Sequence, residues 1–317
     1  MRFILLFVMT VASFHAFAEI ITVDFDQSMG IDNKARYNLL FKQGEHSETI
    51  FNFYRDLYNR NKPSKISTSK ELKIPKIIHQ IWIGPAPYPK LYQKYRDVCL
   101  ALNPDWQYKL WTDKDVENWD FANKDLYNKS ISYQERADIL RYEILYKHGG
   151  LYIDTDYMCL TKLGELNYLY DFYAGAEPPA IEYDSLTVSN ALIGAKPHHR
   201  IFPVLFQKIR KHWDDKKFTN LALTNPRAVP QYRTMSPLTD AIYETYSAGD
   251  ATIILPSTYF MPMVGMSLKY DYLLIDQIKL FLGIYRNVNT FGSIKPESMA
   301  IQDVFDQYIS PNLGNLH

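Results

Sequence analysis

The chain lacks the features that mark nucleic-acid-binding proteins and membrane-spanning proteins. Its 35 basic and 35 acidic residues give a formal net charge of zero, so no overall charge favours binding to nucleic acid or to an anionic membrane. No internal repeat and no low-complexity tract occurs. Beyond the N-terminus, no segment approaches the roughly 18 consecutive apolar residues of a membrane helix, and we expect no span there.

Cysteine is also scarce, because only Cys99 and Cys159 occur. In an exported protein they could form a disulfide, but they could equally be two small buried thiols, and both alternatives stay open. Apolar residues are abundant, at 47% of the chain, and aromatic residues make up 15%. This composition supports a sizeable core, and the rings suit either that core or a surface that stacks on sugars and bases.

The N-terminus has the three parts of a secretory signal peptide. Arg2 supplies a positive charge, an apolar run covers residues 3–14, and Ala16-Phe17-Ala18 forms a small-x-small cleavage site. The run is too short to cross a bilayer, so we predict a cleaved signal peptide over residues 1–18, with an uncleaved anchor as the alternative. The mature protein would be secreted or exported, either from a bacterium (periplasmic, extracellular or delivered to a host) or into a eukaryotic secretory lumen.

Composition suggests three further parts of the chain. Residues 19–70 are predicted to be a helical N-terminal extension, because residues 33–59 are helix-prone and a polar linker containing Pro63 follows them. The main domain is expected over residues 71–300, and residues 301–317 are expected to be a C-terminal tail.

The main domain alternates between strand-like and helix-like segments. Apolar β-rich runs and amphipathic segments follow one another, which predicts an α/β domain with a mostly parallel sheet. Ligands of such sheets bind beyond the carboxyl ends of the strands. The expected strands are 76–83, 106–111, 151–156, 172–175, 191–195 and 251–255, and the expected helices are 90–102, 134–147 and 201–213.

Two carboxylates, Asp154 and Asp156, end one of the expected strands. In a strand, residues i and i+2 point to the same face, so the two would repel each other unless a cation lies beside them. Mg²⁺ and Mn²⁺ prefer such oxygen ligands, typically with phosphates and water. A diphosphate leaving group needs such a cation, and a sugar nucleotide fits this description. On its own, however, an Asp-x-Asp motif is a weak signal.

The helix upstream adds two charged residues. Asp138 and Arg141 are three residues apart and share a helix face, which could be an ordinary surface ion pair. The helix leads through Gly149-Gly150 directly into the strand of Asp154, so its polar face could instead border the same cleft. There Asp138 could accept hydrogen bonds from sugar hydroxyls, and Arg141 could contact sugar or phosphate oxygens.

Residues 135–142 and 145–156 together resemble the signature of the DXD sugar-binding glycosyltransferases. That superfamily includes the initiating mannosyltransferase type (family 32) and the glucosylating domains of large clostridial toxins. Residues 74–84 and 103–111 are similar to two further strand regions of the superfamily. The resemblance implies a glycosyltransferase-A type fold, with a single Rossmann-like domain that binds a nucleotide sugar. It also implies transfer of a hexose or N-acetylhexosamine from a UDP- or GDP-sugar to a glycan or protein acceptor, with retention and with Mn²⁺ or Mg²⁺ as cofactor.

The resemblance also implies roles for individual residues. Trp82 would stack on the nucleotide base, with Gln80 and Ile81 lining the same pocket. The remaining donor-side residues would hold the sugar, the ribose or the metal: Asp138, Arg141, Asp154, Thr155, Asp156 and Asn190. Among these, Asp156 would ligate the metal directly and Asp154 directly or through water, while Asn190 would lie near the donor sugar and the acceptor. A purely structural Asn190, or a core Trp82, is the alternative.

The chain departs from the superfamily pattern at two places. The superfamily's Thr-Gly-Pro turn corresponds here to residues 234–239, where Met235 is conformationally less free than glycine. The usual closing segment, H-H-W-x-x-S-W, has only residues 287–294 as its nearest match. Asn289 could there ligate the metal and Ser293 could bind the cofactor, or the segment could be an unrelated loop.

This second departure motivates an alternative function, a degenerate transferase that binds a sugar nucleotide or glycan without turnover. A metal phosphohydrolase is a third possibility, but the chain lacks the His-rich or multi-Asp constellation expected of its two-metal site.

Overall fold

The computed structural model describes residues 20–31, 38, 45–65, 71–178, 186–215, 229–247, 249–261 and 295–302. The predicted signal peptide, Asn289 and Ser293 lie outside the described residues, as does nearly all of the predicted C-terminal tail. Within the described part of the chain, no helix is both long enough and apolar enough to cross a membrane.

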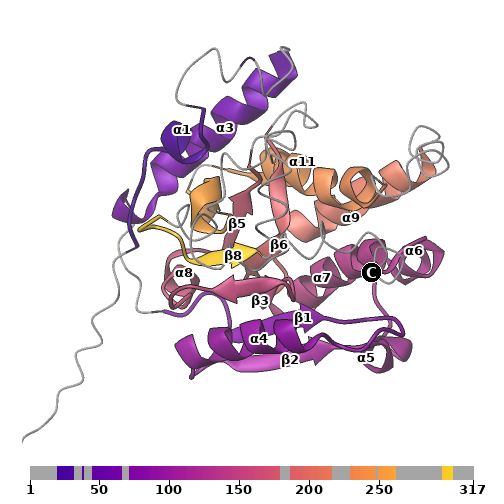
Figure 1. The fold of residues 1–317 in the computed structure, drawn as a ribbon. Coiled ribbons are helices and arrows are strands. Elements are labelled where there is room, and N and C mark those ends of the chain that lie inside the picture. The colour runs from indigo at the N-terminus through magenta and orange to yellow at the C-terminus, as the bar shows by residue number, and fades with distance from the viewer. Residues whose placement is uncertain are drawn as a thin grey trace, which may run out of the picture.

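A six-stranded sheet forms the centre of the molecule, with strand order β2-β1-β3-β6-β5-β7 (Figure 1). β6 is antiparallel to both of its neighbours, whereas the β1–β2, β1–β3 and β5–β7 pairs are parallel. The predicted α/β fold with mostly parallel strands is therefore confirmed. The strands are β1 (Ile77–Ile81), β2 (Gln107–Trp111), β3 (Gly150–Ile153), β5 (Phe172–Ala176), β6 (Val188–Ala195) and β7 (Thr252–Leu255).

A second, two-stranded sheet lies directly after the aspartate pair. Its strands are β4 (Tyr157–Cys159) and β8 (Ala300–Gln302), which run antiparallel with Tyr157 opposite Gln302. The pairing brings the end of the described chain beside the residue that follows Asp156 (Figure 1). β8 crosses the expected start of the tail at residue 301, and the domain boundaries stay predictions.

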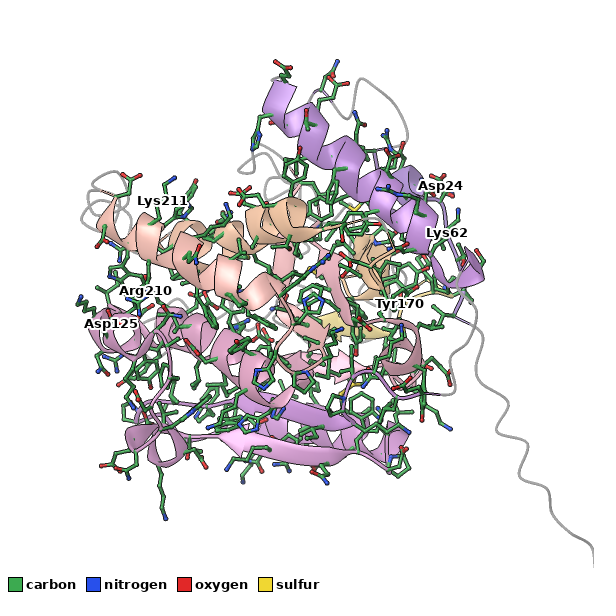
Figure 2. The ribbon with its side chains drawn as sticks, turned by 180° about the vertical axis from the view of Figure 1, so that it is seen from behind. Asp24, Lys62, Asp125, Tyr170, Arg210 and Lys211 are labelled. Atoms are coloured by element: carbon green, nitrogen blue, oxygen red, sulfur yellow. A yellow bond between two sulfur atoms is a disulfide. The ribbon has the colours of Figure 1, made fainter. Side chains whose placement is uncertain are left out.

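Helices cover both faces of the large sheet. α4 (Lys90–Leu102) lies on the face to which Gln80 points, since Arg96 of α4 stacks on Tyr108 and the Tyr108 hydroxyl donates to Gln80. α7 (Tyr133–His148) lies on the opposite face, where its residue His148 packs against His79. α9 (Ile201–Asp214) and α11 (Ser236–Thr245) lie together above α7 in Figure 1. Arg210 of α9 pairs with Asp125 at 2.8 Å, which joins α9 to α6 (Lys124–Lys129) (Figure 2).

The other helices are short, apart from α3. They are α1 (Phe25–Ser28), α3 (Glu45–Asn61), a 3₁₀ turn (Pro63–Lys65), α5 (Asp113–Glu117), α6 (Lys124–Lys129), α8 (Leu166–Leu169), a π-helical turn (Gln231–Met235) and a 3₁₀ turn (Ser257–Tyr259).

Tyrosine supplies much of the core. Most of the largest fully buried side chains are tyrosines, and each needs a hydrogen-bond partner for its hydroxyl. Tyr54 of α3 donates to Thr239 O at 2.6 Å, and Tyr170 donates to Asn61 O at 2.7 Å (Figure 2). The N-terminal helices therefore share one core with the main sheet. Among the described residues ten tyrosines are buried, so this core accounts for part of the total of 25.

Candidate active site

Two glycines make the direct connection from α7 to β3 possible. Gly149 and Gly150 have φ angles of +62° and +100°, which side-chain-bearing residues rarely adopt. A Cβ at Gly150 would lie 2.7 Å from Ile77 O, so β1 could not pair closely with the start of β3. The two glycines therefore fix α7 against the strand that leads to Asp154.

The predicted strand is shorter than expected. β3 ends at Ile153, and the chain turns at Thr155 and Asp156, where Tyr157 N–H donates to Asp154 O at 3.2 Å. The expectation that alternation along a strand places both carboxylates on one face is therefore wrong. The turn, which feeds β4 into its pairing with β8, instead directs Asp154 toward α7 and Asp156 toward Gln302.

The Asp138–Arg141 pair is not a surface ion pair. Its two side chains are 5% and 4% exposed, and Arg141 Nη2 lies 2.7 Å from Asp138 Oδ1. Arg141 Nη1 lies 3.3 Å from Asp154 Oδ1 and donates to Asn190 O at 2.7 Å. The guanidinium also stacks 4.5 Å from the centre of the Tyr152 ring. Arg141 thus joins α7, the end of β3 and β6 into one charged group.

Asp138 is held by two neutral donors besides Arg141. Thr234 Oγ1 donates at 2.6 Å and Asn190 Nδ2 at 3.1 Å. Burial raises the pKa of Asp138 to about 6, against the opposing effects of Arg141 and these donors, while the charge of Asp154 adds to the rise. A carboxylate kept charged at neutral pH by this network can accept hydrogen bonds from a ligand's hydroxyl groups.

Thr234 is a site residue that the sequence reasoning missed. It lies in the π-helical turn before α11, and such turns are frequent at functional sites. The next residue, Met235, has a φ of −85°, so the departure from glycine causes no strain there. In the sequence this stretch is distinctive only because it lacks the glycine of the superfamily pattern, although Thr234 is the residue that donates to Asp138.

The turn at residues 154–156, called the aspartate turn below, provides hard oxygen ligands for a cation. Asp156 is 8% exposed and its Oδ2 accepts from Gln302 Nε2 at 3.1 Å, while the Asp154 side chain is 26% exposed. The described residues contain no group of three or more His, Cys, Asp or Glu side chains arranged for a metal. Two carboxylates fit Mg²⁺ or Mn²⁺ when phosphate oxygens of a substrate complete the coordination.

The three residues predicted to form the base pocket differ in exposure. Gln80 is buried, and its Oε1 accepts hydrogen bonds from Tyr108 at 2.9 Å and Tyr88 at 3.1 Å. Its Nε2 donates to Asp154 O at 3.3 Å, so Gln80 supports the turn from behind. Ile81 is in the core, whereas Trp82 is partly exposed and donates to Ala86 O at 2.7 Å. Of the three, Trp82 is the side chain with surface to offer a base.

A disulfide links Cys99 of α4 to Cys159 of β4, which resolves the alternative that the sequence left open. Cys159 comes three residues after Asp156. The cross-link therefore anchors the short strand that follows the aspartate turn to a long helix.

Comparison with known proteins identifies a family for part of the chain. Residues 89–173 match the sequence model of the family described as "Glycosyltransferase sugar-binding region containing DXD motif". The resemblance predicted from the residues around Asp138 and Asp154 is thereby confirmed.

Named relatives are similar to part of the chain. Inositol phosphoceramide mannosyltransferase 2 of Schizosaccharomyces pombe is 32% identical over 179 residues, which are 50% of this chain and 49% of that protein. An uncharacterized glycosyltransferase of Acanthamoeba polyphaga mimivirus is 34% identical over 142 residues, 43% of this chain and 55% of the viral protein. The chain thus spans about half the length of the curated relatives it matches. Their names agree with the predicted enzyme class.

Solved structures give weaker similarities. PaToxG glycosyltransferase aligns with a TM-score of 0.45 and 17% identity over 62% of this chain and 78% of that chain. The catalytic domain of alpha-toxin from Clostridium novyi aligns with a TM-score of 0.42 and 12% identity, over 71% and 74% of the two chains.

Proposed function

We propose that this protein is a metal-dependent glycosyltransferase that transfers a hexose or N-acetylhexosamine from a UDP- or GDP-sugar to a hydroxyl of a glycan or protein acceptor. The observation that supports this most directly is the buried group of Asp138, Arg141 and Asn190, which meets Asp154 where β3 ends. Transfer with retention follows from the resemblance to the DXD superfamily.

In this proposal each residue has a definite task. The exposed part of Trp82 stacks on the base, and Asp138 with Asn190 binds hydroxyls of the donor sugar. Arg141 places positive charge beside the sugar and diphosphate oxygens. Mn²⁺ or Mg²⁺ at Asp156, and at Asp154 directly or through water, would neutralise the charge that develops on the diphosphate as it leaves.

The names of the yeast relatives suggest what to test first. They are described as mannosyltransferases that act on inositol phosphoceramide, which makes a mannosyl donor the first choice and an inositol hydroxyl an additional acceptor for the assay. We also propose that the protein is exported after cleavage of residues 1–18. The Cys99–Cys159 disulfide supports this, because disulfides persist in oxidising compartments.

The test is release of nucleoside diphosphate from a panel of UDP- and GDP-sugars in Mn²⁺, with and without a soluble glycan or myo-inositol. We expect release from at least one donor, and we expect Asp138→Asn to lower it about 100-fold, since a buried charged partner of Arg141 is lost. Asp105→Asn is the matched control, because Asp105 is exposed and pairs only with Lys76 of the described residues.

Two results would contradict the transferase. If the wild-type protein binds a sugar nucleotide but releases no product with any acceptor or with water, it is the degenerate binding module instead. If it binds no sugar nucleotide at all, both functions are wrong.

A further inference from the structure

Two strands of the large sheet end at the same edge as the aspartate turn. β3 and β5 are each antiparallel to β6, which lies between them, so their carboxyl ends point the same way. Asp154 follows β3 and Glu177 follows β5. Neighbouring strands are about 4.8 Å apart, which places the two chain segments about 10 Å apart along this edge.

Glu177 is fixed to β6 at two points. Its N–H donates to Thr187 O at 2.8 Å, beyond a shift in the β5–β6 register, and the Ser189 hydroxyl donates to its carboxylate. Bulges of this kind often re-aim side chains next to active sites. The following residue of β6, Asn190, donates to Asp138. Successive residues of one strand thus connect Glu177 with the group proposed to hold the donor sugar.

The Tyr157 hydroxyl is a second polar group to consider beside Glu177. Its side chain is fully buried, yet its hydroxyl makes no hydrogen bond to the described part of the chain. Burial raises the pKa of this hydroxyl well above its usual range, and the charges of Glu177, Asp156 and Asp154 raise it further, with Glu177 contributing most of the three. Tyr157 is the first residue of β4 and directly follows Asp156, so it belongs to the same end of the sheet as the aspartate turn. A buried hydroxyl without a partner costs free energy, which a bound ligand atom would recover.

The strand order indicates where Glu177 and Tyr157 lie relative to the proposed sugar-nucleotide donor. Trp82 follows β1, the aspartate turn follows β3, Asn190 is in β6 and Glu177 follows β5. A donor with its base at Trp82 and its sugar at Asn190 leaves Glu177 at the far end, next to the sugar. That is where an acceptor hydroxyl must lie to reach the anomeric carbon.

We propose that Glu177 and Tyr157 bind the acceptor hydroxyl of the transfer reaction, with the Glu177 carboxylate accepting its hydrogen bond and the Tyr157 hydroxyl donating to its oxygen. The inference rests on the proposed transferase function and specifies where its acceptor, an alcohol, is held. In transfer, the acceptor oxygen bonds to the anomeric carbon, the bond from that carbon to the diphosphate breaks and the diphosphate leaves with the electron pair, and the acceptor proton passes to the Glu177 carboxylate that accepts its hydrogen bond.

A role for Glu177 as a third metal ligand does not fit the structure. The described residues include no set of three acidic or other ligand side chains close enough to share a cation, and Glu177 belongs to that described part. Burial raises the pKa of Glu177 to about 7, Ser189 opposes the rise and Asp154 adds to it. Such a carboxyl suits contact with a neutral hydroxyl better than ligation of a divalent ion.

The first test is Tyr157→Phe, measured by donor hydrolysis, in which water takes the place of the acceptor hydroxyl. We expect kcat to fall about 10-fold, the donor Kd to stay within 2-fold, and Tm to stay the same or rise, because no hydrogen bond of the protein is lost. Tyr173→Phe is the matched control. Tyr173 is equally buried but donates to Asn167 at 2.9 Å, so that variant should lower Tm and leave kcat unchanged.

The second test is Glu177→Gln, which keeps an acceptor for the Ser189 hydroxyl and removes the charge. We expect the same pattern, a fall in kcat of about 10-fold or more with an unchanged donor Kd. Wild-type kcat in both variants, or a donor Kd that weakens in step with kcat, would overturn the inference and leave the transferase standing. A wild-type protein that neither binds nor hydrolyses any donor would instead refute the proposed function, and this inference with it.

Discussion

Thr234 connects two parts of the molecule that lie far apart in sequence. Its hydroxyl donates to Asp138, 96 residues away, and this is a bond between a neutral donor and a buried carboxylate. Hydrogen bonds to buried charges are worth about 1.5–3 kcal/mol, and removing the donor leaves the carboxylate oxygen less satisfied. The orientation of Asp138 toward a donor sugar therefore depends on Thr234.

We predict that Thr234→Val weakens sugar-nucleotide binding about 10-fold and lowers Tm, because valine has the same shape but cannot donate to Asp138. Thr234→Ser should keep wild-type affinity, since the hydroxyl is retained. Isothermal titration of the two variants with the same donor decides the matter. Equal affinities for the valine and serine variants would show that the hydroxyl does not position Asp138.

His79 is a second residue whose buried environment has a measurable consequence. It is 2% exposed, with Nε2 2.9 Å from Gly149 O, while Trp111 Nε1 donates to its Nδ1 at 3.2 Å. These partners require the neutral ring. Burial lowers the pKa of His79 to about 4, the bond to Gly149 opposes this, and nearby His148 lowers it further.

Below an unfolded-state pKa of about 6.5, the unfolded chain binds a proton at His79 that the folded chain excludes. Stability from this residue is therefore present above pH 6.5 and is lost as pH falls toward about 4. We predict that the free energy of unfolding of the wild type falls, relative to that of His79→Gln, by about 2 kcal/mol between pH 7.5 and pH 5. Urea titrations at the two pH values measure it, and a gap that does not change with pH would contradict the assignment.

At the scale of elements, the disulfide and the two small strands stabilise the aspartate turn from outside. β4 pairs with β8, whose Gln302 contacts Asp156, and Cys159 of β4 is cross-linked to α4. The turn itself is only a few residues long and has little surface of its own to bury. Its conformation is therefore expected to depend on these neighbours.

We predict that the double variant Cys99→Ser, Cys159→Ser lowers the free energy of unfolding by about 4 kcal/mol, as expected when a loop of 60 residues is no longer closed in the unfolded chain. Its affinity for Mn²⁺ in the presence of donor should fall as well, because β4 is less firmly held. Chemical denaturation and metal titration of the two proteins are the measurements. A variant as stable as the oxidised wild type would mean that the cross-link does not form.

At the scale of the whole molecule, sequence patterns predicted the helices and strands, whose formation depends mainly on residues close together in the chain. The helix at 90–102 was predicted with the bounds it has, and the Asp138–Arg141 helix and the strand before Asp154 were placed within a few residues. The contacts of Thr234 with Asp138 and of Gln302 with Asp156 join residues 96 and 146 positions apart. Periodicity carries no information about such pairs, which is why Thr234, Gln302, Tyr157 and Glu177 were missed.

The end of β3 is an instructive case. An apolar run followed by Asp-Thr-Asp reads as one continuous strand, and that interpretation put both carboxylates on one face. The strand stops at Ile153 because the chain must turn to pair β4 with β8, and β8 lies nearly 150 residues downstream. The motif was recognised correctly, and the directions of its side chains needed the tertiary structure.

The most direct test of the account is isothermal titration of UDP- and GDP-sugars into the wild-type protein and Asp156→Asn, each in Mn²⁺ and in EDTA. The account predicts that at least one donor binds the wild type at least about 10-fold more tightly in Mn²⁺ than in EDTA, and that Asp156→Asn loses this difference while keeping its Tm within a few degrees. Binding that is the same in Mn²⁺ and EDTA, or a metal effect that survives in Asp156→Asn, would contradict it.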